Sequence, residues 1–172
     1  NQFFFFFSEL RLEENKEFLK FLILIAQDKI MHAGQKFELL KQQYVETGNL
    51  QNLTEALSIL DKILQNPVLK TMDTEFGLNI RTDYSEICLR LYWAEGSLNH
   101  LNTAINIAND AIDQTQDLSN LPSRLSNLSL GLKERYSHFG VIEDLETSIN
   151  KLSYAIEITK KYPNKSCNLP VL

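Results

Sequence analysis

The chain has 172 residues, of which 44% are hydrophobic and 23% charged, and its net charge is −5. That composition is typical of a folded globular protein large enough to bury a sizeable core. The acidic balance, with Lys and Arg scattered singly, disfavours nucleic-acid binding and a basic helix on an anionic membrane, since both need clustered positive charge. Two cysteines are too few for a disulfide framework and fit a reducing compartment.

Residues 1–29 begin with a Phe-rich run, Phe3–Phe7, and continue into the apolar stretch 18–26. Neither stretch reaches the roughly 20 apolar residues of a membrane span, and neither resembles a secretory signal. We therefore expect a cytoplasmic protein without membrane contact. The Phe run could pack on the first repeat or meet a partner domain or a second copy of the chain in self-association, and we expect a mixture of the two, partly core and partly interface. The stretch 18–26 fits the second helix of an incomplete earlier repeat.

A pattern anchored on a glycine then recurs three times, at a spacing of 48 residues and then of 44. A Tyr stands four residues before each Gly, apolar residues stand two and five after it, and a small residue stands eight after it. A fixed period of this kind is the signature of a repeat architecture. The glycines are Gly48, Gly96 and Gly140, and the small residues are Ala56, Ala104 and Ser148.

Each copy predicts a pair of antiparallel helices. After each Gly, apolar or small residues recur at steps of three and four, which indicates an amphipathic helix. A similar stripe precedes each Gly, which stands where the first helix must end, a position that favours a left-handed residue. The predicted repeats cover residues 30–66, 67–116 and 117–162. A further repeat is expected to open within 163–172, where Asn168-Leu169-Pro170 repeats the Asn120-Leu121-Pro122 that opens the third.

These positions resemble tetratricopeptide (TPR) repeats, whose first helix carries an apolar residue eight before the turn Gly and an aromatic four before it. The unit here is longer than the usual period of about 34 residues, and it is similar to the long repeats found next to CHAT caspase-like domains. The resemblance implies an all-α, right-handed superhelical solenoid of antiparallel helix pairs. The residues of the third copy that carry it are Leu132, Tyr136, Gly140, Ser148, Ile149 and Ala155.

The resemblance also implies a function: a non-catalytic scaffold for protein–protein interaction, with any effector domain, such as a CHAT protease, outside these residues. The alternative is a regulatory domain that senses a short peptide in its concave groove. By the same resemblance, the first helices line that groove. The candidate partner-binding residues are Glu38, Gln42, Glu46, Asp83, Glu86, Arg90, Trp93, Asn127, Glu134 and His138.

This candidate set is polar and mildly acidic, so we expect a protein or peptide partner that carries Lys or Arg. Trp93 is the one candidate aromatic anchor, because Trp is common at interfaces. The alternative is that the polar side chains are merely solvated, or that Trp93 packs against the next helix.

Residues capable of catalysis or metal binding are sparse. The three histidines share no metal-ligand spacing, and no Gly-rich phosphate loop or GxSxG elbow occurs. Cys88 stands at the core position that Leu40 and Leu132 occupy in the other repeats, so we expect a small buried hydrophobe rather than a nucleophile. The sequence therefore predicts no enzyme, no metal and no cofactor.

Overall fold

The computed structural model describes the backbone of residues 2–162 and the side chains of residues 15–162. Over this range the chain forms α-helices and two short 3₁₀ helices, without strands, so the all-α prediction is confirmed there. The α-helices are α1 (Gln2–Thr47), α2 (Leu50–Gln65), α3 (Thr74–Glu95), α4 (Leu98–Asp113), α5 (Leu121–Phe139) and α6 (Ile142–Lys161), and the 3₁₀ helices are η1 (Pro67–Thr71) and η2 (Leu118–Asn120).

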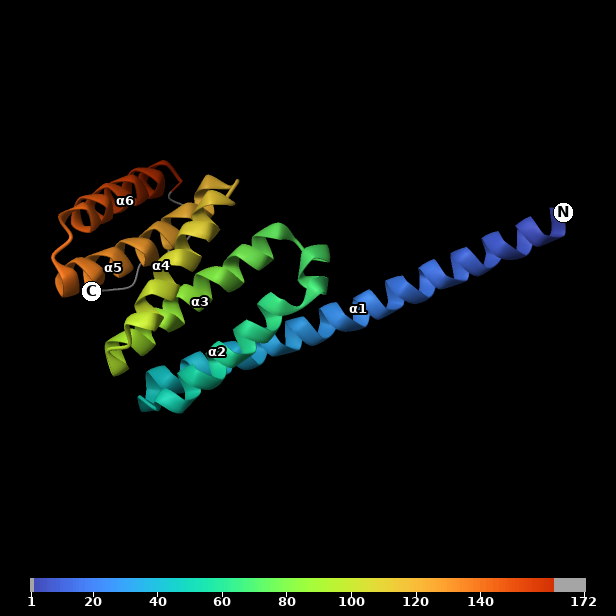
Figure 1. Cartoon of the computed structure of the whole chain (residues 1–172), viewed down its shortest axis with the longest axis horizontal. Helices are drawn as coiled ribbons and strands as arrows, with labels where there is room; N and C mark the ends of the chain where they lie inside the picture. The colour runs from blue at the N-terminus through green and yellow to red at the C-terminus, as the bar shows by residue number, and fades with distance from the viewer. Residues whose placement is uncertain (1, 163–172) are drawn as a thin grey trace.

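Helices that follow each other in the chain pack side by side. α1 packs on α2, α3 on α4 and α5 on α6, and successive pairs meet through α2 with α3 and through α4 with α5. Short turns between consecutive helices favour this antiparallel arrangement of neighbours. Figure 1 shows the pairs in a row, with α1 at one end, α6 at the other, and the N-terminal half of α1 extending well beyond α2.

All three turn glycines have the left-handed backbone conformation that the sequence predicts. The φ angle is 68° at Gly48, 72° at Gly96 and 71° at Gly140. Each Gly donates its backbone N–H to the carbonyl of the Tyr four residues earlier, at 2.7–2.8 Å. A side chain would place Cβ too close to the following carbonyl oxygen in this conformation, so Gly ends each first helix without that cost.

The small residues predicted for the second helices are buried where each hairpin closes. Ala56, Ala104 and Ser148 all lie in the interior. In the second hairpin, Oγ of Ser85 donates to the carbonyl of Ala104 at 2.9 Å; in the third, Oγ of Ser148 donates to the carbonyl of Ser129 at 2.9 Å. The two bonds join the same two repeat positions with donor and acceptor exchanged, so the hydroxyls of Ser85 and Ser148 both have a hydrogen-bond partner.

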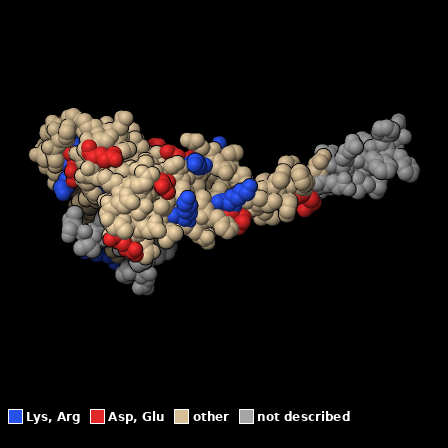
Figure 2. All heavy atoms as spheres, turned by 90° about the horizontal axis from the view of Figure 1, so that it is seen from below, with Lys and Arg blue, Asp and Glu red and all other residues tan. Residues whose placement is uncertain are grey.

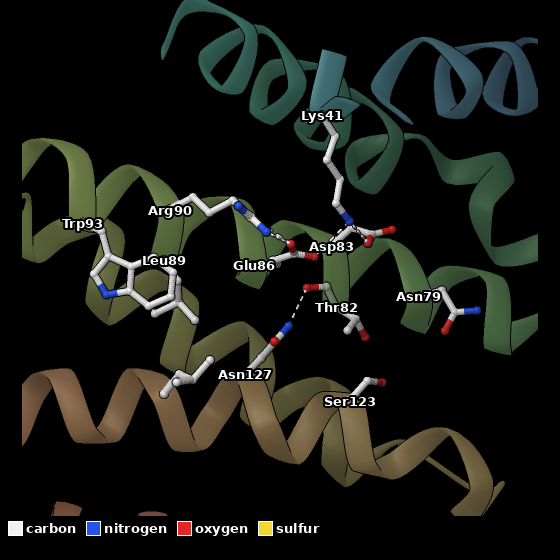
Figure 3. A pocket seen from close by; sticks show the side chains of 11 residues that line it. Lys41, Asn79, Thr82, Asp83, Glu86, Leu89, Arg90, Trp93, Ser123 and Asn127 are labelled. Carbon is white, nitrogen blue, oxygen red and sulfur yellow. Dashed lines mark hydrogen bonds and ion pairs between the residues drawn. The ribbon is translucent and has the colours of Figure 1, made fainter. Parts of the chain in front are cut away.

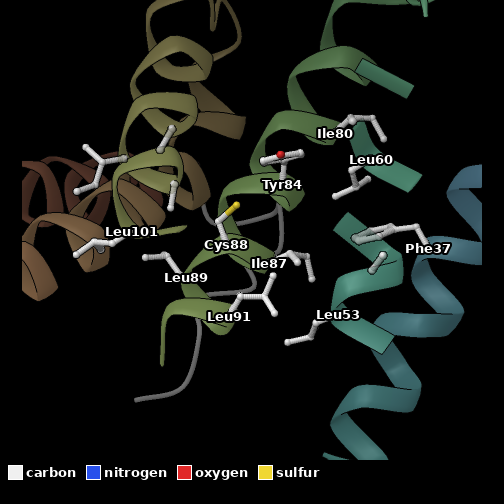
Figure 4. Packing of buried hydrophobic residues seen from close by; sticks show 14 of the residues in the cluster. Phe37, Leu53, Leu60, Ile80, Tyr84, Ile87, Cys88, Leu89, Leu91 and Leu101 are labelled. Atoms are coloured by element: carbon white, nitrogen blue, oxygen red, sulfur yellow. The ribbon is translucent and has the colours of Figure 1, made fainter. Parts of the chain in front are cut away.

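Cys88 lies in the core, as predicted, together with its repeat equivalents Leu40 and Leu132. Figure 4 shows Cys88 on α3 between neighbours of the first hairpin, such as Leu53, and of α4, such as Leu101. Burial, with a smaller contribution from Asp61, raises the pKa of its thiol to about 12. The thiol therefore stays protonated and unreactive near neutral pH.

The N-terminal residues depart from the prediction. We expected the stretch 18–26 to form a separate second helix, with a repeat boundary at residue 29. α1 instead runs without interruption through that boundary to Thr47. Its span contains no Pro, and its one glycine, Gly34, stays within the helix, so nothing interrupts the i→i−4 hydrogen bonds. The side chains of Phe3–Phe7 lie outside the described residues.

The apolar stretch of α1 lies on the surface. Phe18, Leu22 and Ile25 are exposed, and charged residues such as Glu17 and Lys20, which pair at 2.7 Å, lie among them. Among the described residues, no helix combines the length and the hydrophobicity needed to cross a bilayer.

Candidate functional site

A hollow of about 450 Å³ opens between α1, α3 and α5, the first helices of the three hairpins. Figure 3 shows α3 across its middle, with Lys41 reaching in from α1 and Ser123 and Asn127 from α5. We call this hollow the central groove. Its lining residues are Lys41, Asn79, Thr82, Asp83, Glu86, Leu89, Arg90, Trp93, Ser123, Asn127 and Leu130.

A chain of ion pairs joins α1 to α3 along the groove. Nζ of Lys41 donates to Oε2 of Glu86 at 2.9 Å and lies 3.6 Å from Oδ1 of Asp83. Nε and Nη2 of Arg90 donate to Oε1 of the same Glu86 at 2.9 and 2.8 Å. Glu86 therefore has two close cationic partners, whereas Asp83 shares Lys41 at a longer distance.

These surroundings shift the pKa values of the two carboxyls in opposite directions. Burial raises the pKa of Asp83, Lys41 offsets this only in part, and Glu38 and Glu86 raise it further, to about 6. Burial also raises the pKa of Glu86, but Lys41 and Arg90 more than offset it, so that the pKa falls below its usual value. Asp83 is thus the carboxylate with the least charge compensation in the groove.

Lys41 remains charged in this setting. Burial disfavours its ammonium form, but Glu86, Asp83 and Glu38 together outweigh burial and raise its pKa. The groove therefore presents fixed charges of both signs at neutral pH.

The opposite end of the groove is apolar. Trp93, the one tryptophan of the chain, is 50% exposed. Figure 3 shows it beside Leu89, and Leu130 of α5 completes this end. Half of the Trp93 surface is therefore free to meet a ligand, as Trp commonly does at interfaces.

A buried arginine beneath the polar end of the groove holds two of the lining side chains by hydrogen bonds. Arg124 of α5 is 1% exposed and forms an ion pair with Glu75 of α3. Its guanidinium also donates to side-chain oxygens of Asn79 at 3.0 Å, Thr82 at 3.2 Å and Thr115 at 2.5 Å. Asn79 and Thr82 line the central groove, whereas Arg124 does not. Arg124 therefore orients two residues of the groove lining from the interior.

Five of the ten predicted partner-binding residues line the central groove. They come from α3 and α5, where the repeat pattern puts them on one face. They are Asp83, Glu86, Arg90, Trp93 and Asn127.

The other five predicted residues lie elsewhere. Glu38 and Gln42 line a neighbouring hollow on α1, and Gln42 donates to exposed Glu46 at 2.9 Å. Glu134 and His138 lie further along α5 and do not line the central groove. The His138 ring instead packs edge-on against Phe139, with centroids 4.6 Å apart.

The sequence prediction missed further groove residues that fall at two repeat-equivalent positions. Lys41 and Leu89 each stand seven residues before their turn Gly, and Asn79 and Ser123 stand seventeen before theirs. The latter position lies one helical turn before that of Asp83. Extending the i, i+4 pattern by one turn would therefore have found it.

The groove offers charged and hydrogen-bonding groups at one end and an apolar surface at the other, an arrangement suited to binding. Within the described residues, no group of three or more His, Cys, Asp or Glu side chains is placed to hold a metal ion. On the face drawn in Figure 2, acidic and basic side chains lie scattered among neutral ones. Comparisons with protein families, curated proteins and solved structures find no match to this chain.

Proposed function

We propose that this chain is a non-catalytic, cytoplasmic binding scaffold in which TPR-like hairpins stack as a right-handed solenoid. Its central groove holds a peptide segment of a partner protein. The observation that supports this best is that one groove collects side chains from the first helices of all three hairpins. Repeat proteins bind their partners on such surfaces, which extend over several repeats. An effector domain outside these residues is part of the same proposal.

The charges of the groove favour a basic partner segment. Three carboxylates, those of Glu38, Asp83 and Glu86, interact with Lys41, whose only cationic companion in the groove lining is Arg90. A Lys or Arg side chain of the partner would compensate the charge of Asp83, which lies farther from Lys41 than Glu86 does. An apolar partner residue next to it would cover the free surface of Trp93. The partner chemistry is thus a basic residue close to an apolar one.

The experiment uses Trp93 as a built-in reporter. Short synthetic peptides that combine Lys or Arg with a nearby Leu are titrated into the chain, and matched peptides carry Glu in place of the basic residue. We expect the basic peptides to change the emission of Trp93 in a saturable manner and the acidic ones to leave it unchanged. Because this is the one Trp in the chain, any such change reports on the groove itself.

Variants then locate the binding by polarisation of a labelled basic peptide. Trp93→Ala and Asp83→Asn should each weaken binding by roughly tenfold, the size of one anchor contact. Phe139→Ala is the matched control, because Phe139 is a similarly exposed aromatic side chain outside the groove lining. Equal affinity in all four proteins would refute the proposal.

A further inference from the structure

α6 carries an apolar stripe that the described residues leave uncovered. Ile142, Ile149, Leu152 and Ile156 are all exposed, Ile149 by 55%. They follow each other at helical spacing and therefore lie on one side of the helix. Figure 1 shows α6 at the end of the row, and its helix neighbours in the described chain are α5 and η2.

The equivalent residues of the preceding hairpin are covered. Ile105 of α4 corresponds to Ile149 and is 2% exposed, because it packs against Gly131 of α5. Ala108 corresponds to Leu152 and is also buried. In the second hairpin, this face of the second helix, α4, packs against the first helix of the next hairpin, α5. The stripe is the corresponding face of α6.

α1 of another copy is poorly suited to cover this stripe. Where α3 covers α2, it presents Ile80 and Tyr84, and Tyr84 also donates to Asp61 of α2 at 2.8 Å. The equivalent residues of α1 are His32 and Lys36, both of which are exposed. Stacking α1 on α6 would place polar side chains against the stripe, which disfavours a head-to-tail chain of copies.

The stripe is instead complementary to itself. Glu146, Ser153 and Lys160 follow its exposed edge at intervals of seven residues. An antiparallel two-fold pairing reverses this order in the partner copy, so Glu146 of one copy lies opposite Lys160 of the other. In this register the two-fold axis passes next to Ser153, so Leu152 meets Leu152 of the partner copy near the centre and Ile149 lies close to Ile156 of the partner copy. Charges at such flanking positions set the orientation of paired helices.

We propose that α6 pairs with α6 of a second copy, antiparallel and about a two-fold axis. This pairing is independent of the central groove, which lies between α1, α3 and α5. One helix pair buries less than the roughly 800 Å² per partner of a standard interface, so the dimer is weak, with micromolar affinity.

The test is the mass of the 172-residue chain by sedimentation velocity and light scattering, from low to high micromolar concentration. We expect reversible conversion from monomer to dimer, and only monomer for Ile149→Asp. That substitution should leave the circular dichroism unchanged, since the side chain is already half exposed. Glu146→Lys alone and Lys160→Glu alone should each weaken the dimer at least severalfold, and the two together should restore it.

Restoration by the double exchange separates the antiparallel pairing from association elsewhere. The matched control is Phe21→Ser, which removes an equally exposed apolar side chain from α1 and should leave the dimer intact. A chain that stays monomeric at the highest concentration overturns the proposal. So does association that survives Ile149→Asp, or that disappears with Phe21→Ser.

Discussion

Ile105 of α4 lies directly against the backbone of Gly131 in α5, so closely that a Cβ at residue 131 would come within 2.7 Å of Cγ1 of Ile105. This contact joins the second hairpin to the third. Ile105 is β-branched and has little rotamer freedom, so it cannot easily move aside. The absence of a side chain at residue 131 therefore sets how closely α4 and α5 approach.

Gly131→Ala should lower the free energy of unfolding by about 1 kcal/mol, because overpacking outweighs the gain in helix propensity. Gly34→Ala is the matched control. Gly34 is also helical, but a Cβ there meets no atom within 4 Å, so this change should stabilise the chain by up to about 1 kcal/mol. Urea denaturation measures both. In an Ile105→Ala background the cost of Gly131→Ala should vanish, and an undiminished cost would show that Ile105 is not its cause.

Gly96→Ala should destabilise the chain by about 1 kcal/mol although the space around Gly96 is open, because its φ of 72° is unfavourable for a side chain. Gly96→Asn should cost less, since Asn tolerates the left-handed region better. Thermal and urea unfolding of the two variants test this order. Equal stability of the Ala variant and the unaltered chain would mean that the turn relaxes to another conformation.

Asp83→Asn and Glu86→Gln should have opposite effects at neutral pH. The pKa of Asp83 is raised to about 6 in the folded chain, so its ionised form opposes folding at pH 7, and this penalty shrinks as the pH falls through 6. Asp83→Asn should therefore stabilise the chain at pH 7 by about 1–3 kcal/mol and lose that advantage towards pH 4.

The pKa of Glu86 is lowered, so its ionised form stabilises the fold above the usual carboxyl pKa and loses this effect as the pH falls through the lowered value. Glu86→Gln should thus destabilise the chain at pH 7, by about 1–3 kcal/mol. Urea unfolding between pH 4 and about 8 follows both variants. Destabilisation by both substitutions at pH 7 would contradict the assigned charge balance.

Arg124→Met should destabilise the chain by about 3 kcal/mol, because it leaves the partly buried carboxylate of Glu75 without its cationic partner. Arg124→Lys keeps the charge but not the planar fork of donors, so its loss should be intermediate. The control is Arg81→Met, since Arg81 is only half-buried and donates to its own helix at Gly77 at 3.4 Å. If urea denaturation gives similar small decreases in the free energy of unfolding for all three variants, the hydrogen bonds and ion pair of Arg124 add little to stability.

Several features of the fold are readable from the sequence because they arise from neighbouring residues. The turn at Gly96 follows from backbone sterics, and the packing of Ala104 follows from the period of the helix. Asp83, Trp93 and Asn127 were expected to line one groove only because of the resemblance to TPR repeats, which assigns their positions before the turn glycines to the inner face. The continuity of α1 was not predicted. The apolar stretch 18–26 is compatible with either helix of a hairpin, and the sequence gives no separate signal that the helix continues through residue 29.

What the sequence by itself determined is the repeating unit: where each first helix ends, which residues are small, and which face is apolar. These properties depend on residues within one or two helical turns. The tertiary structure alone decided the partners across repeats, such as Lys41 with Glu86 and Arg124 with Glu75, which are 45 and 49 residues apart. It also decided that Ile105 is covered while Ile149 is exposed. The two residues have the same type and repeat position, and they differ only because a helix packs on one and none of the described helices packs on the other.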